Sequence, residues 1–472
     1  MTRTLLRGAR IITLGQHRPD WEHADILIES DTILEVGPSL DSTGADIIDL
    51  DGRIIHPGLV NAHLHTWQTG LRTIGTDWTL AQYLANTHGT IAHYYRPEDM
   101  RIAALVGGLG QIDCGITTIG DWCHNNPSPA HSDAAIEGLV ESGVRAVFLH
   151  GAPYTRIAAD SAREIDRLLN GPGRRHDLLT IGMAIRGPQL SSAGRAIDDL
   201  RTARERGIIA SMHQTGGVMK PAWAQVREQC LFGPNVNIAH GAGLSDEWVE
   251  ILVDAGVTFT STPENELGQG HSDPVTAQLL PLGAAPSLGT DTDCVTNGDL
   301  HTSARIALAY QRGAGHNKHR QEVGIFSPTT PVTSRQALEW ATIEGARALG
   351  LADRVGRIEP GMQADLVVLD PRTITMWPAT DCIAAALNAH PGTIEAVMVA
   401  GRWRKQHHAL ARTDLPHVLD ALEESSDRII EKFESPDLLT RARQRAVDRI
   451  AGHRMRKQLG TPVSRTSQPH RR

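Results

Sequence analysis

The 472-residue sequence lacks the cysteine pattern of a disulfide-stabilised or cysteine-ligated protein. It has only five cysteines, an odd number, and no two of them form a Cys-x-x-Cys pair. They are scattered at Cys114, Cys123, Cys230, Cys294 and Cys382. Neither a disulfide framework nor a zinc site made of cysteines is therefore indicated.

The sequence also lacks long apolar runs and an overall dominance of charge of one sign. No apolar stretch is long enough to span a bilayer, and no signal peptide precedes the first predicted strand. The net charge is −8 with both signs interspersed, which gives no reason to expect binding to nucleic acid or to a membrane. We therefore expect a cytoplasmic protein whose partner is a small-molecule substrate.

The two ends of the chain carry the pattern of a small β module. Residues 4–14 and 25–37 alternate apolar and polar side chains, which predicts antiparallel strands. Asp51-Gly52 marks a further hairpin. Strand patterns return in residues 355–370 and 394–405. We predict a β-sandwich module built from both chain ends.

Between these ends, short apolar runs alternate with alanine-rich helical stretches. The strand candidates are a run beginning at Leu59 and the stretches 115–122, 144–153, 178–188, 208–217, 236–244, 257–265 and 285–293. Eight alternating units predict the α/β fold class and a (β/α)8 TIM-type barrel. A doubly wound open sheet is the alternative, and it would require a reversal of strand order that the sequence cannot show.

A chain of this length fits one large barrel plus a smaller module. We place the two halves of the β module at residues 1–57 and 353–410, and the barrel at residues 58–352. The remaining residues, 411–472, are predicted to hold terminal helices and a basic tail.

We make separate predictions for two stretches near the C-terminus. Residues 334–350 are predicted to form one amphipathic helix with a serine cap and a terminal glycine. Residues 416–457 are predicted to be helical, and the basic residues 454–472 to form a disordered tail.

His63 and His65 end the first predicted barrel strand, in HPGLVNAHLH (56–65). Alternate residues of a strand point the same way, so both imidazoles share one face. Two imidazoles converging at a strand end can begin a metal site. The pair alone is weak evidence, because hydrogen-bonded or solvated histidines are common, and the spacing of later residues has to decide.

Polar residues end the other predicted barrel strands as well, where barrels place their functional residues. The set is Asp121, His150, Arg186, His213, His240, Glu264, Glu266 and Asp291. A single histidine of this kind could be a core residue whose ring nitrogens are hydrogen-bonded within the protein. Four histidines and one aspartate at the ends of strands one, five, six and eight together indicate a metal centre.

These motifs resemble the amidohydrolase superfamily, in the branch that holds triazine hydrolases, cytosine deaminases and S-adenosylhomocysteine deaminases. The matching stretches are PGLVNAHLH (57–65), GITTIGDW (115–122), NIAHGAGLSDEW (237–248), SLGTDTDCVTNGDLHTSARIAL (287–308), ATIEGARALGL (341–351) and VGRIEPGMQADLVVLD (355–370). NAHLHTWQTGLR and GDWCHNNP are more loosely similar to molinate and phenylurea hydrolases, a branch that cuts amide-like C–N bonds.

The resemblance implies that one divalent metal ion is held by His63, His65, His213 and Asp291. Imidazoles and a carboxylate suit zinc first, and also iron, manganese or cobalt. Asp291 could serve as both ligand and base, while His240 orients the water and stabilises developing charge. No lysine ends strand four, so the carboxylated lysine that bridges two metals in other amidohydrolases has no candidate there.

One position departs from the deaminases of this branch. Those enzymes carry a glutamate three residues after the strand-five histidine, and it moves protons to the substrate ring and the leaving ammonia. Here that position is Gly216. By loop position, the nearest substitutes are Glu264, Glu266 and His271, although shaping the loop is an equally good interpretation.

Other residues are candidates for substrate binding. Arg186 could bind a carbonyl or anionic group, or form a structural salt bridge. Trp67, Gln68 and Trp78 in the first barrel loop could form an aromatic pocket with Trp122, for which core packing is an equally good interpretation.

The sequence therefore predicts a metal-dependent amidohydrolase that hydrolyses a non-peptide C–N bond of an amide, urea or carbamate-like small molecule. Two alternatives stay open: deamination of a nitrogen heterocycle or nucleoside-like substrate, and a non-catalytic binding barrel. By analogy with relatives we expect a homo-oligomer, a dimer or larger.

Overall fold

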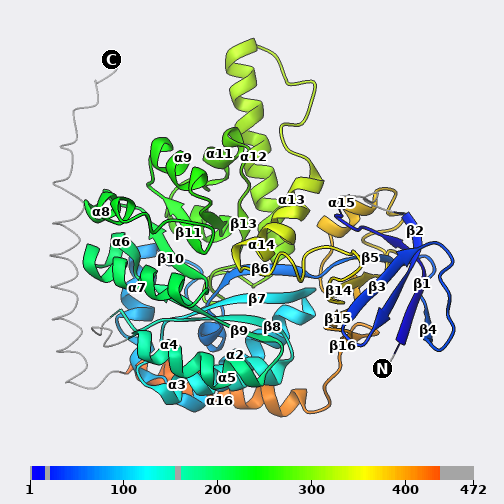
Figure 1. The fold of residues 1–472 in the computed structure, drawn as a ribbon, viewed down its shortest axis with the longest axis horizontal. Coiled ribbons are helices and arrows are strands. Elements are labelled where there is room, and N and C mark those ends of the chain that lie inside the picture. Colours follow the sequence, from blue (N-terminus) through cyan, green and yellow to red (C-terminus); the bar gives the residue numbers. More distant parts are fainter. Residues whose placement is uncertain (1–2, 16–21, 155–160, 436–472) are drawn as a thin grey trace, which may run out of the picture.

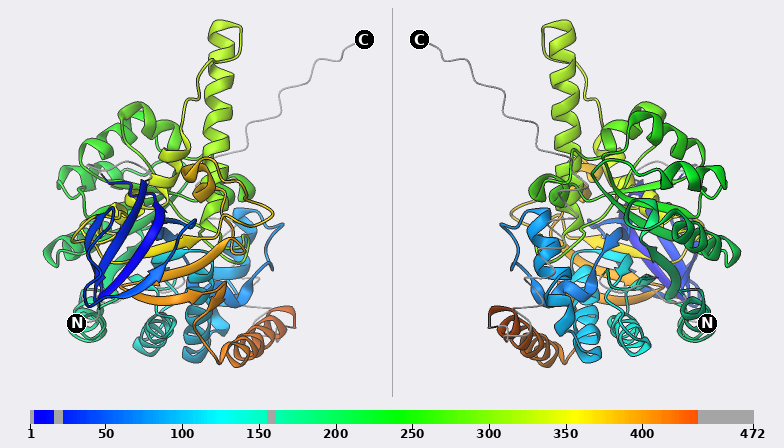
Figure 2. Two further views of the ribbon diagram at one scale, coloured as in Figure 1. Left: turned by 90° about the vertical axis from the view of Figure 1, so that its right-hand side faces the viewer. Right: turned by 90° about the vertical axis from the view of Figure 1, so that its left-hand side faces the viewer.

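The computed structural model describes residues 3–15, 22–154 and 161–435. It shows a barrel surrounded by helices, with a smaller sheet at one side (Figure 1). Two further views show the N-terminal strands in blue next to the C-terminal strands in yellow and orange (Figure 2). The predicted tail lies outside the described residues.

Eight parallel strands form the barrel wall. In chain order they are β6 (Leu59–Leu64), β7 (Ile116–Cys123), β8 (Arg145–His150), β9 (Leu179–Ile185), β10 (Ala210–Thr215), β11 (Val236–Ala242), β12 (Thr258–Ser261) and β13 (Ser287–Leu288). Each strand pairs with the next, and a parallel bridge between Leu64 and Asp291 joins the last back to the first. The predicted barrel is confirmed, and the open sheet does not apply because the strand order has no reversal.

The barrel strands are buried on both faces. Every residue of β6, β7 and β8 is buried, which suits parallel strands covered by helices. The covering helices are α2 (Pro97–Asp113), α3 (Pro129–Ser142), α4 (Ser161–Asn170), α7 (Ala193–Glu205), α8 (Ala222–Glu228), α9 (Asp246–Asp254), α11 (Thr276–Leu279) and α12 (Leu300–Val323). Helix α12 extends well beyond the barrel (Figure 1). Within the described ranges, no helix combines the length and apolarity needed to cross a membrane.

Shorter helices fill the connections. They are η1 (Thr66–Leu71), α1 (Leu80–Tyr83), η2 (Leu84–His88), η3 (Ile91–Tyr94), α5 (Pro172–Arg175), α6 (Gly187–Leu190), α10 (Pro263–Gln269) and η4 (Leu280–Leu282). Four of them, η1, α1, η2 and η3, follow one another in the long segment between β6 and α2. This segment supplies several of the side chains around the site.

The single helix predicted over residues 334–350 is wrong. The structure has two helices, α13 (Ser334–Trp340) and α14 (Ile343–Ala348). Thr342 lies between them with φ −131° and ψ −90°, outside the helical region, and its hydroxyl donates to Leu338 O at 2.7 Å. The cap is also different, because Thr333 and Gln336 form the capping box of α13.

The small module from both chain ends is confirmed as one mixed nine-stranded sheet. Its strands are β1 (Arg3–Ile11), β2 (Glu22–Glu29), β3 (Thr32–Gly37), β4 (Asp46–Asp49), β5 (Ile54–Pro57), β14 (Leu366–Leu369), β15 (Ile394–Val399), β16 (Arg402–Gln406) and β17 (Ala409–Leu410). The two halves meet where β5 pairs with β14. Apolar residues from both halves, among them Ile26, Ile55 and Leu366, share a separate core.

The last described helices attach the C-terminal segment to the rest of the fold. α15 (Cys382–Leu387) lies between β14 and β15 in the chain. α16 (Leu415–Glu434) packs Val418 against Leu105 and Leu109 of α2, and Ser425 Oγ donates to Asp99 Oδ1 at 2.7 Å. The predicted terminal helix is thus present as far as Glu434, and the rest of residues 416–457 lies outside the described part apart from Ser435.

A buried ion pair joins the barrel to the small module. Arg145 at the start of β8 donates from Nε and Nη2 to the two carboxylate oxygens of Asp365, both at 2.9 Å. Both side chains are 2% exposed. Asp365 also accepts the Ala400 N–H at 2.7 Å, so its carboxylate is shared by β8, β14 and the β15–β16 turn.

We predict that Arg145→Met strongly destabilises the protein, because it leaves the Asp365 carboxylate buried without its cation. Removing one partner of a buried pair typically costs about 3–5 kcal/mol. Urea unfolding of the metal-loaded protein measures the loss. Arg3→Met, which breaks the far more exposed Arg3–Glu29 pair, is the matched control and should cost no more than about 1 kcal/mol. Equal effects of the two substitutions would contradict this role for the buried pair.

Candidate metal centre

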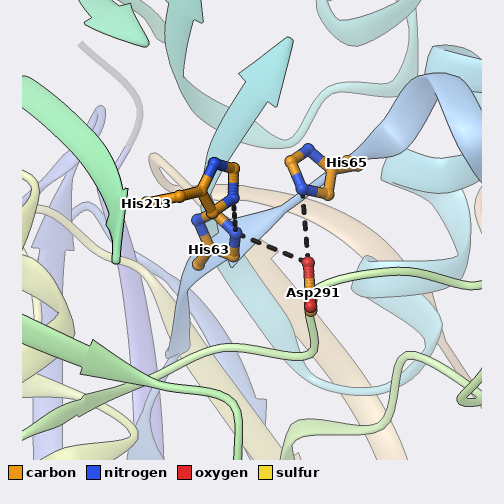
Figure 3. A group of neighbouring side chains, drawn as sticks. All are labelled: His63, His65, His213 and Asp291. Atoms are coloured by element: carbon orange, nitrogen blue, oxygen red, sulfur yellow. Dashed lines mark hydrogen bonds and ion pairs between the residues drawn. The ribbon is translucent and has the colours of Figure 1, made fainter. Parts of the chain in front are cut away.

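Four predicted ligands converge at the C-terminal end of the barrel (Figure 3). They are His63 and His65 of β6, His213 of β10, and Asp291 just after β13. All four are buried, and their ligand atoms lie within 4.8 Å of one another. The Nε2 atoms of His63 and His213 are 3.0 Å apart, and Asp291 Oδ1 lies 3.5 Å from His63 Nε2 and 3.2 Å from His65 Nε2.

The backbone fixes Asp291 against the first strand. Its N–H donates to His63 O at 3.0 Å, and its carbonyl accepts the His65 N–H at 2.8 Å. Asp291 has φ +61°, a left-handed conformation that non-glycine residues rarely adopt and that functional sites often contain. The hydrogen bonds that close the barrel therefore also hold three of the four candidate ligands in register.

Hydrogen bonds on the far side of two rings turn Nε2 toward the cluster. His65 Nδ1 lies 2.6 Å from the carbonyl oxygen of Trp122, which can only accept, so this nitrogen carries the proton and Nε2 keeps its lone pair. His213 Nδ1 lies 3.0 Å from Tyr154 Oη. Such outer partners orient histidine ligands in metal sites.

The electrostatics favour the protonation states that bind a metal. Burial lowers the pKa of His63 to about 4 and that of His213 well below its usual value. Burial alone would raise the pKa of Asp291, but the imidazoles of His63 and His65 beside its carboxylate bring it well below its usual value. His63 and His213 therefore face the ionised Asp291 carboxylate as neutral imidazoles at neutral pH.

This donor set fits a divalent cation. The lone pairs of neutral imidazoles point at one small volume, and the carboxylate supplies negative charge beside them. The Nε2 atoms of His63 and His213 are so close that, if both are unprotonated, their lone pairs repel each other, and a cation between them would relieve this repulsion. Imidazole and carboxylate are ligands of zinc and of other first-row divalent metals.

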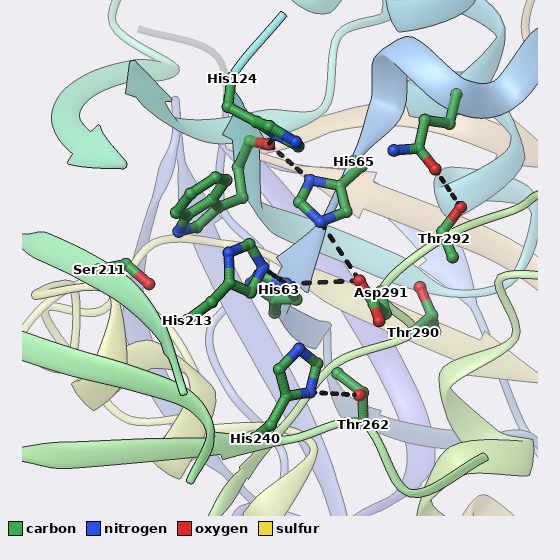
Figure 4. A network of polar contacts seen from close by, with 12 residues as sticks. His63, His65, His124, Ser211, His213, His240, Thr262, Thr290, Asp291 and Thr292 are labelled. Atoms are coloured by element: carbon green, nitrogen blue, oxygen red, sulfur yellow. Dashed lines mark hydrogen bonds and ion pairs between the residues drawn. The ribbon is translucent and has the colours of Figure 1, made fainter. Parts of the chain in front are cut away.

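His240 stands beside the four ligands at the end of β11. Its ring stacks on that of His213, with centroids 5.5 Å apart and planes 13° apart. Its Nδ1 lies 3.0 Å from Thr262 Oγ1 (Figure 4). The same nitrogen lies 3.4 Å from Glu266 Oε1. Like Asp291, His240 has a positive φ, +69°, so both predicted catalytic residues adopt a rare backbone conformation.

Glu266 is buried behind His240. It accepts hydrogen bonds from the Ser261 hydroxyl and the Thr262 N–H, both at 2.7 Å. Burial raises the pKa of Glu266 to about 7. Its position in α10 makes it a partner of His240, and it does not line the cavity described next.

A cavity of about 410 Å³ opens over the cluster. Its lining includes Asp291, the ligands His65 and His213, and also His240. It is completed by Leu80, Tyr83, Leu84, His88, Gly89, Tyr154, Arg186, Leu190, Thr215 and His271. Of the residues predicted to bind substrate, the structure thus brings Arg186 and His271 to the cavity.

The other predicted substrate residues lie away from this lining. Trp67 is fully buried and packs on Tyr95, with ring centroids 5.1 Å apart. Gln68 is fully buried and donates to Tyr83 Oη at 2.8 Å, which positions a cavity residue. Trp78 packs against Phe433 of α16, and Glu264 is partly exposed on α10.

Two strand-end residues also lie apart from the cluster. Asp121 accepts the Thr66 N–H at 3.0 Å, and burial raises its pKa to about 6. His150 lines a second cavity together with residues that follow β7, β8 and β9, and burial lowers its pKa to about 4.

Sequence reasoning missed Tyr83, His88, His124 and Tyr154. His124 and Tyr154 follow β7 and β8 closely, so their position after a barrel strand was an available signal. Tyr83 and His88 come from the long segment between β6 and α2, where no periodic pattern indicates which side chains turn inward.

We predict that Gly289→Ala weakens metal binding. A Cβ at Gly289 would lie 2.7 Å from His63 O and 2.8 Å from His63 Cβ, so it would displace a ligand. Disturbing the support of a ligand typically lowers metal affinity about 10–100-fold. Competition with a chromogenic chelator measures this loss. Gly268→Ala in α10, where an added Cβ meets nothing within 4 Å, should leave the affinity unchanged. Unchanged affinity in Gly289→Ala would contradict the proposed geometry.

We predict a pH-dependent effect of Glu266→Gln on stability. Because the pKa of Glu266 is raised to about 7 from 4.5, wild-type stability falls as pH rises between these values. Glutamine resembles the protonated acid, so the variant should become more stable relative to wild type between about pH 5 and pH 8, by up to about 3 kcal/mol. Thermal unfolding at both pH values tests this, with the exposed Glu250→Gln as control. A difference that does not change with pH would contradict the raised pKa.

Comparisons with known proteins agree with this geometry. The family model described as "Amidohydrolase family" matches residues 54–404. The 5-methylthioadenosine/S-adenosylhomocysteine deaminase of Desulforamulus reducens is 25% identical over 451 residues, covering 92% of this chain and 100% of that protein. The 5'-deoxyadenosine deaminase of Methanosarcina mazei is 23% identical over 455 residues, covering 92% and 100%.

Solved structures show the same fold. Atrazine chlorohydrolase from Arthrobacter aurescens, complexed with zinc, superposes with a TM-score of 0.78 at 21% identity, covering 90% of this chain and 100% of that one. An adenosine deaminase from Xanthomonas campestris with bound zinc gives a TM-score of 0.77 at 19% identity, covering 91% and 99%. The resemblance to the branch of triazine hydrolases and S-adenosylhomocysteine deaminases is confirmed. The chain belongs to the amidohydrolase family, and it is a hydrolase of carbon–nitrogen bonds whose group of three histidines and one aspartate could hold a divalent metal ion.

Proposed function

We propose that this enzyme hydrolyses a non-peptide, acyl-type C–N bond, as in an amide, urea or carbamate-like small molecule. The observation that carries this proposal is the number of carboxylate side chains that line the cavity. Asp291 is the only carboxylate among the described residues that line it. Gly216, in the position where related deaminases carry a glutamate, has φ +104° and offers no proton-transfer group.

We propose zinc as the metal, held by His63, His65, His213 and Asp291. Its support is the set of three nitrogens and one oxygen, together with the zinc in two solved structures of the same fold. A bound divalent cation would lower the pKa of a water molecule from about 15.7 toward about 7 and so supply hydroxide at neutral pH.

Asp291 is placed to move the proton. Its Oδ1 faces His63 and His65, while Oδ2 makes no hydrogen bond to any described residue and belongs to a cavity-lining side chain. This oxygen can take a proton from the attacking water and pass it to the leaving nitrogen. An acyl substrate requires only this transfer, because the departing amine is the group that has to be protonated.

His240 and Arg186 would orient the reacting groups. Thr262 and Glu266 hold Nδ1 of His240, which leaves Nε2 directed toward the ligand group to stabilise negative charge that develops on the substrate oxygen. Arg186 lines the same cavity, and its Nη2 donates to Pro153 O at 2.7 Å. Its guanidinium could bind a carbonyl or an anionic substituent.

Ring deamination is the second candidate, and the deaminase relatives favour it. It requires a further group to carry protons to the ring and to ammonia. His271 lines the cavity, and its ring centroid lies 4.6 Å from that of His240, so it is the candidate for this role.

The cellular location and assembly remain predictions. We propose a cytoplasmic enzyme that acts on a small molecule, and a homo-oligomer of two or more chains by analogy with relatives.

We predict that kcat/KM for phenylureas or thiocarbamates exceeds that for cytosine and adenosine derivatives by about 10²–10⁴, the usual value of one positioned acid–base group. The zinc-loaded enzyme is assayed on both classes side by side. Faster ring deamination would contradict the proposal. In that case His271→Ala should abolish deamination while metal analysis still finds the ion bound, which separates loss of proton transfer from loss of the site.

A further inference from the structure

Two histidines outside the ligand set, the partly buried His88 and the buried His124, form a pair beside the cluster. His88 ends η2 in the segment between β6 and α2, and His124 follows β7 directly. His124 lies on the opposite side of the ligand group from His240 (Figure 4). His124 Nε2 lies 3.2 Å from His88 Nδ1, and His124 Nδ1 lies 3.3 Å from the carbonyl oxygen of Trp122.

The Trp122 carbonyl fixes where the protons of this pair lie. A carbonyl oxygen can only accept, so Nδ1 of His124 carries the proton and Nε2 of His124 holds a lone pair. That lone pair can only accept from His88, so Nδ1 of His88 carries the proton of the second ring. Nε2 of a neutral His88 is then left with a lone pair.

This last lone pair faces the substrate cavity. His88 lines the cavity, and its Nε2 has no hydrogen-bond partner within residues 3–15, 22–154 and 161–435, nor is it among the fully enclosed unpaired atoms there. The ring is held between Tyr83 and Tyr154, with centroids 5.2 and 5.5 Å away. Burial lowers the pKa of His88 to about 3, so the ring is neutral.

We infer that His88 is a specificity-determining residue that accepts a hydrogen bond from an N–H group of the substrate, and that His124 is the positioning residue that keeps Nε2 of His88 unprotonated. This inference rests on the proposed function and narrows its substrate class. Among amides, ureas and carbamates, those that keep an N–H are favoured over their N-alkylated counterparts. A bound substrate with a fully substituted nitrogen would cover this acceptor without giving it a donor, which is costly.

The protonation pattern can be tested without any activity. Neutron crystallography of the zinc-loaded, deuterium-exchanged enzyme at neutral pH should show deuterium on Nδ1 of His124 and of His88, and none on Nε2 of His88. Deuterium on Nε2 of His88 would overturn the inference, because the group facing the substrate would then be a donor. This measurement uses the unaltered chain, so it does not depend on whether a variant folds.

The specificity is tested with matched substrate pairs. We compare kcat/KM for an N-phenylurea that keeps its N–H with kcat/KM for its N-methyl analogue, in wild type and in His88→Phe. The ratio of the two values should fall about tenfold in His88→Phe, the equivalent of one hydrogen bond. His124→Phe should lower the same ratio in part. It removes the acceptor that keeps the proton of His88 on Nδ1, so the proton can also occupy Nε2, and it does so without touching the substrate. His316→Phe on α12, outside the cavity, should leave the ratio as in wild type.

The outcomes separate this inference from the proposed function. If wild type cleaves the ureas and the ratio is the same in His88→Phe, the acceptor role is wrong and acyl hydrolysis stands. If wild type cleaves no acyl substrate and the neutron map shows the predicted protons, the proposed function is wrong and the acceptor at His88 stands.

Discussion

Closure of the barrel and assembly of the metal site depend on the same hydrogen bonds. The eighth strand, β13, has only two residues, so it contributes little pairing of its own. The connection back to β6 is completed by Asp291, through its N–H to His63 O and its carbonyl to the His65 N–H. A metal that binds these three residues and His213 therefore also holds the first and last strands together, and metal binding is coupled to the stability of the barrel.

A second constraint comes from one backbone carbonyl. Trp122 O lies 2.6 Å from His65 Nδ1 and 3.3 Å from His124 Nδ1, and one carbonyl oxygen has two lone pairs to accept both protons. The same atom thus orients a candidate metal ligand and, through His124, a residue that lines the cavity. Because β7 is a fully buried barrel strand, this carbonyl has little freedom to move. The chemistry of the cavity is in this way set by the scaffold rather than by the loops alone.

The barrel and the ligand group could be predicted from the sequence because their signals are local. Buried parallel strands are short apolar runs, and a histidine or aspartate where such a run ends has to lie at the active face of a barrel. His63, His65, His213 and Asp291 follow from that rule. The break at Thr342 could not be predicted, since the amphipathic pattern runs on through residues 334–350 and the two-helix form is set by packing against the barrel.

The cavity wall is the part that the sequence could not predict. Trp67 and Gln68 follow His65 in the chain, yet η1 turns both into the interior, while His88, more than twenty positions later, reaches the cavity. Which side chains of the β6–α2 segment face the cavity depends on contacts with β7, α2 and α16, and these contacts follow no sequence period. The proposed substrate contact of His88 comes from this segment, whereas the candidate metal ligands come from the strand ends.

The most direct test of the account is to titrate metal back into the chelated enzyme while measuring C–N bond hydrolysis. We predict that activity rises linearly with added zinc and reaches its full value at one ion per chain, because three imidazoles and one carboxylate form a single site. Full activity in the metal-free protein, or a requirement for a second ion, would contradict a mononuclear metal-dependent hydrolase.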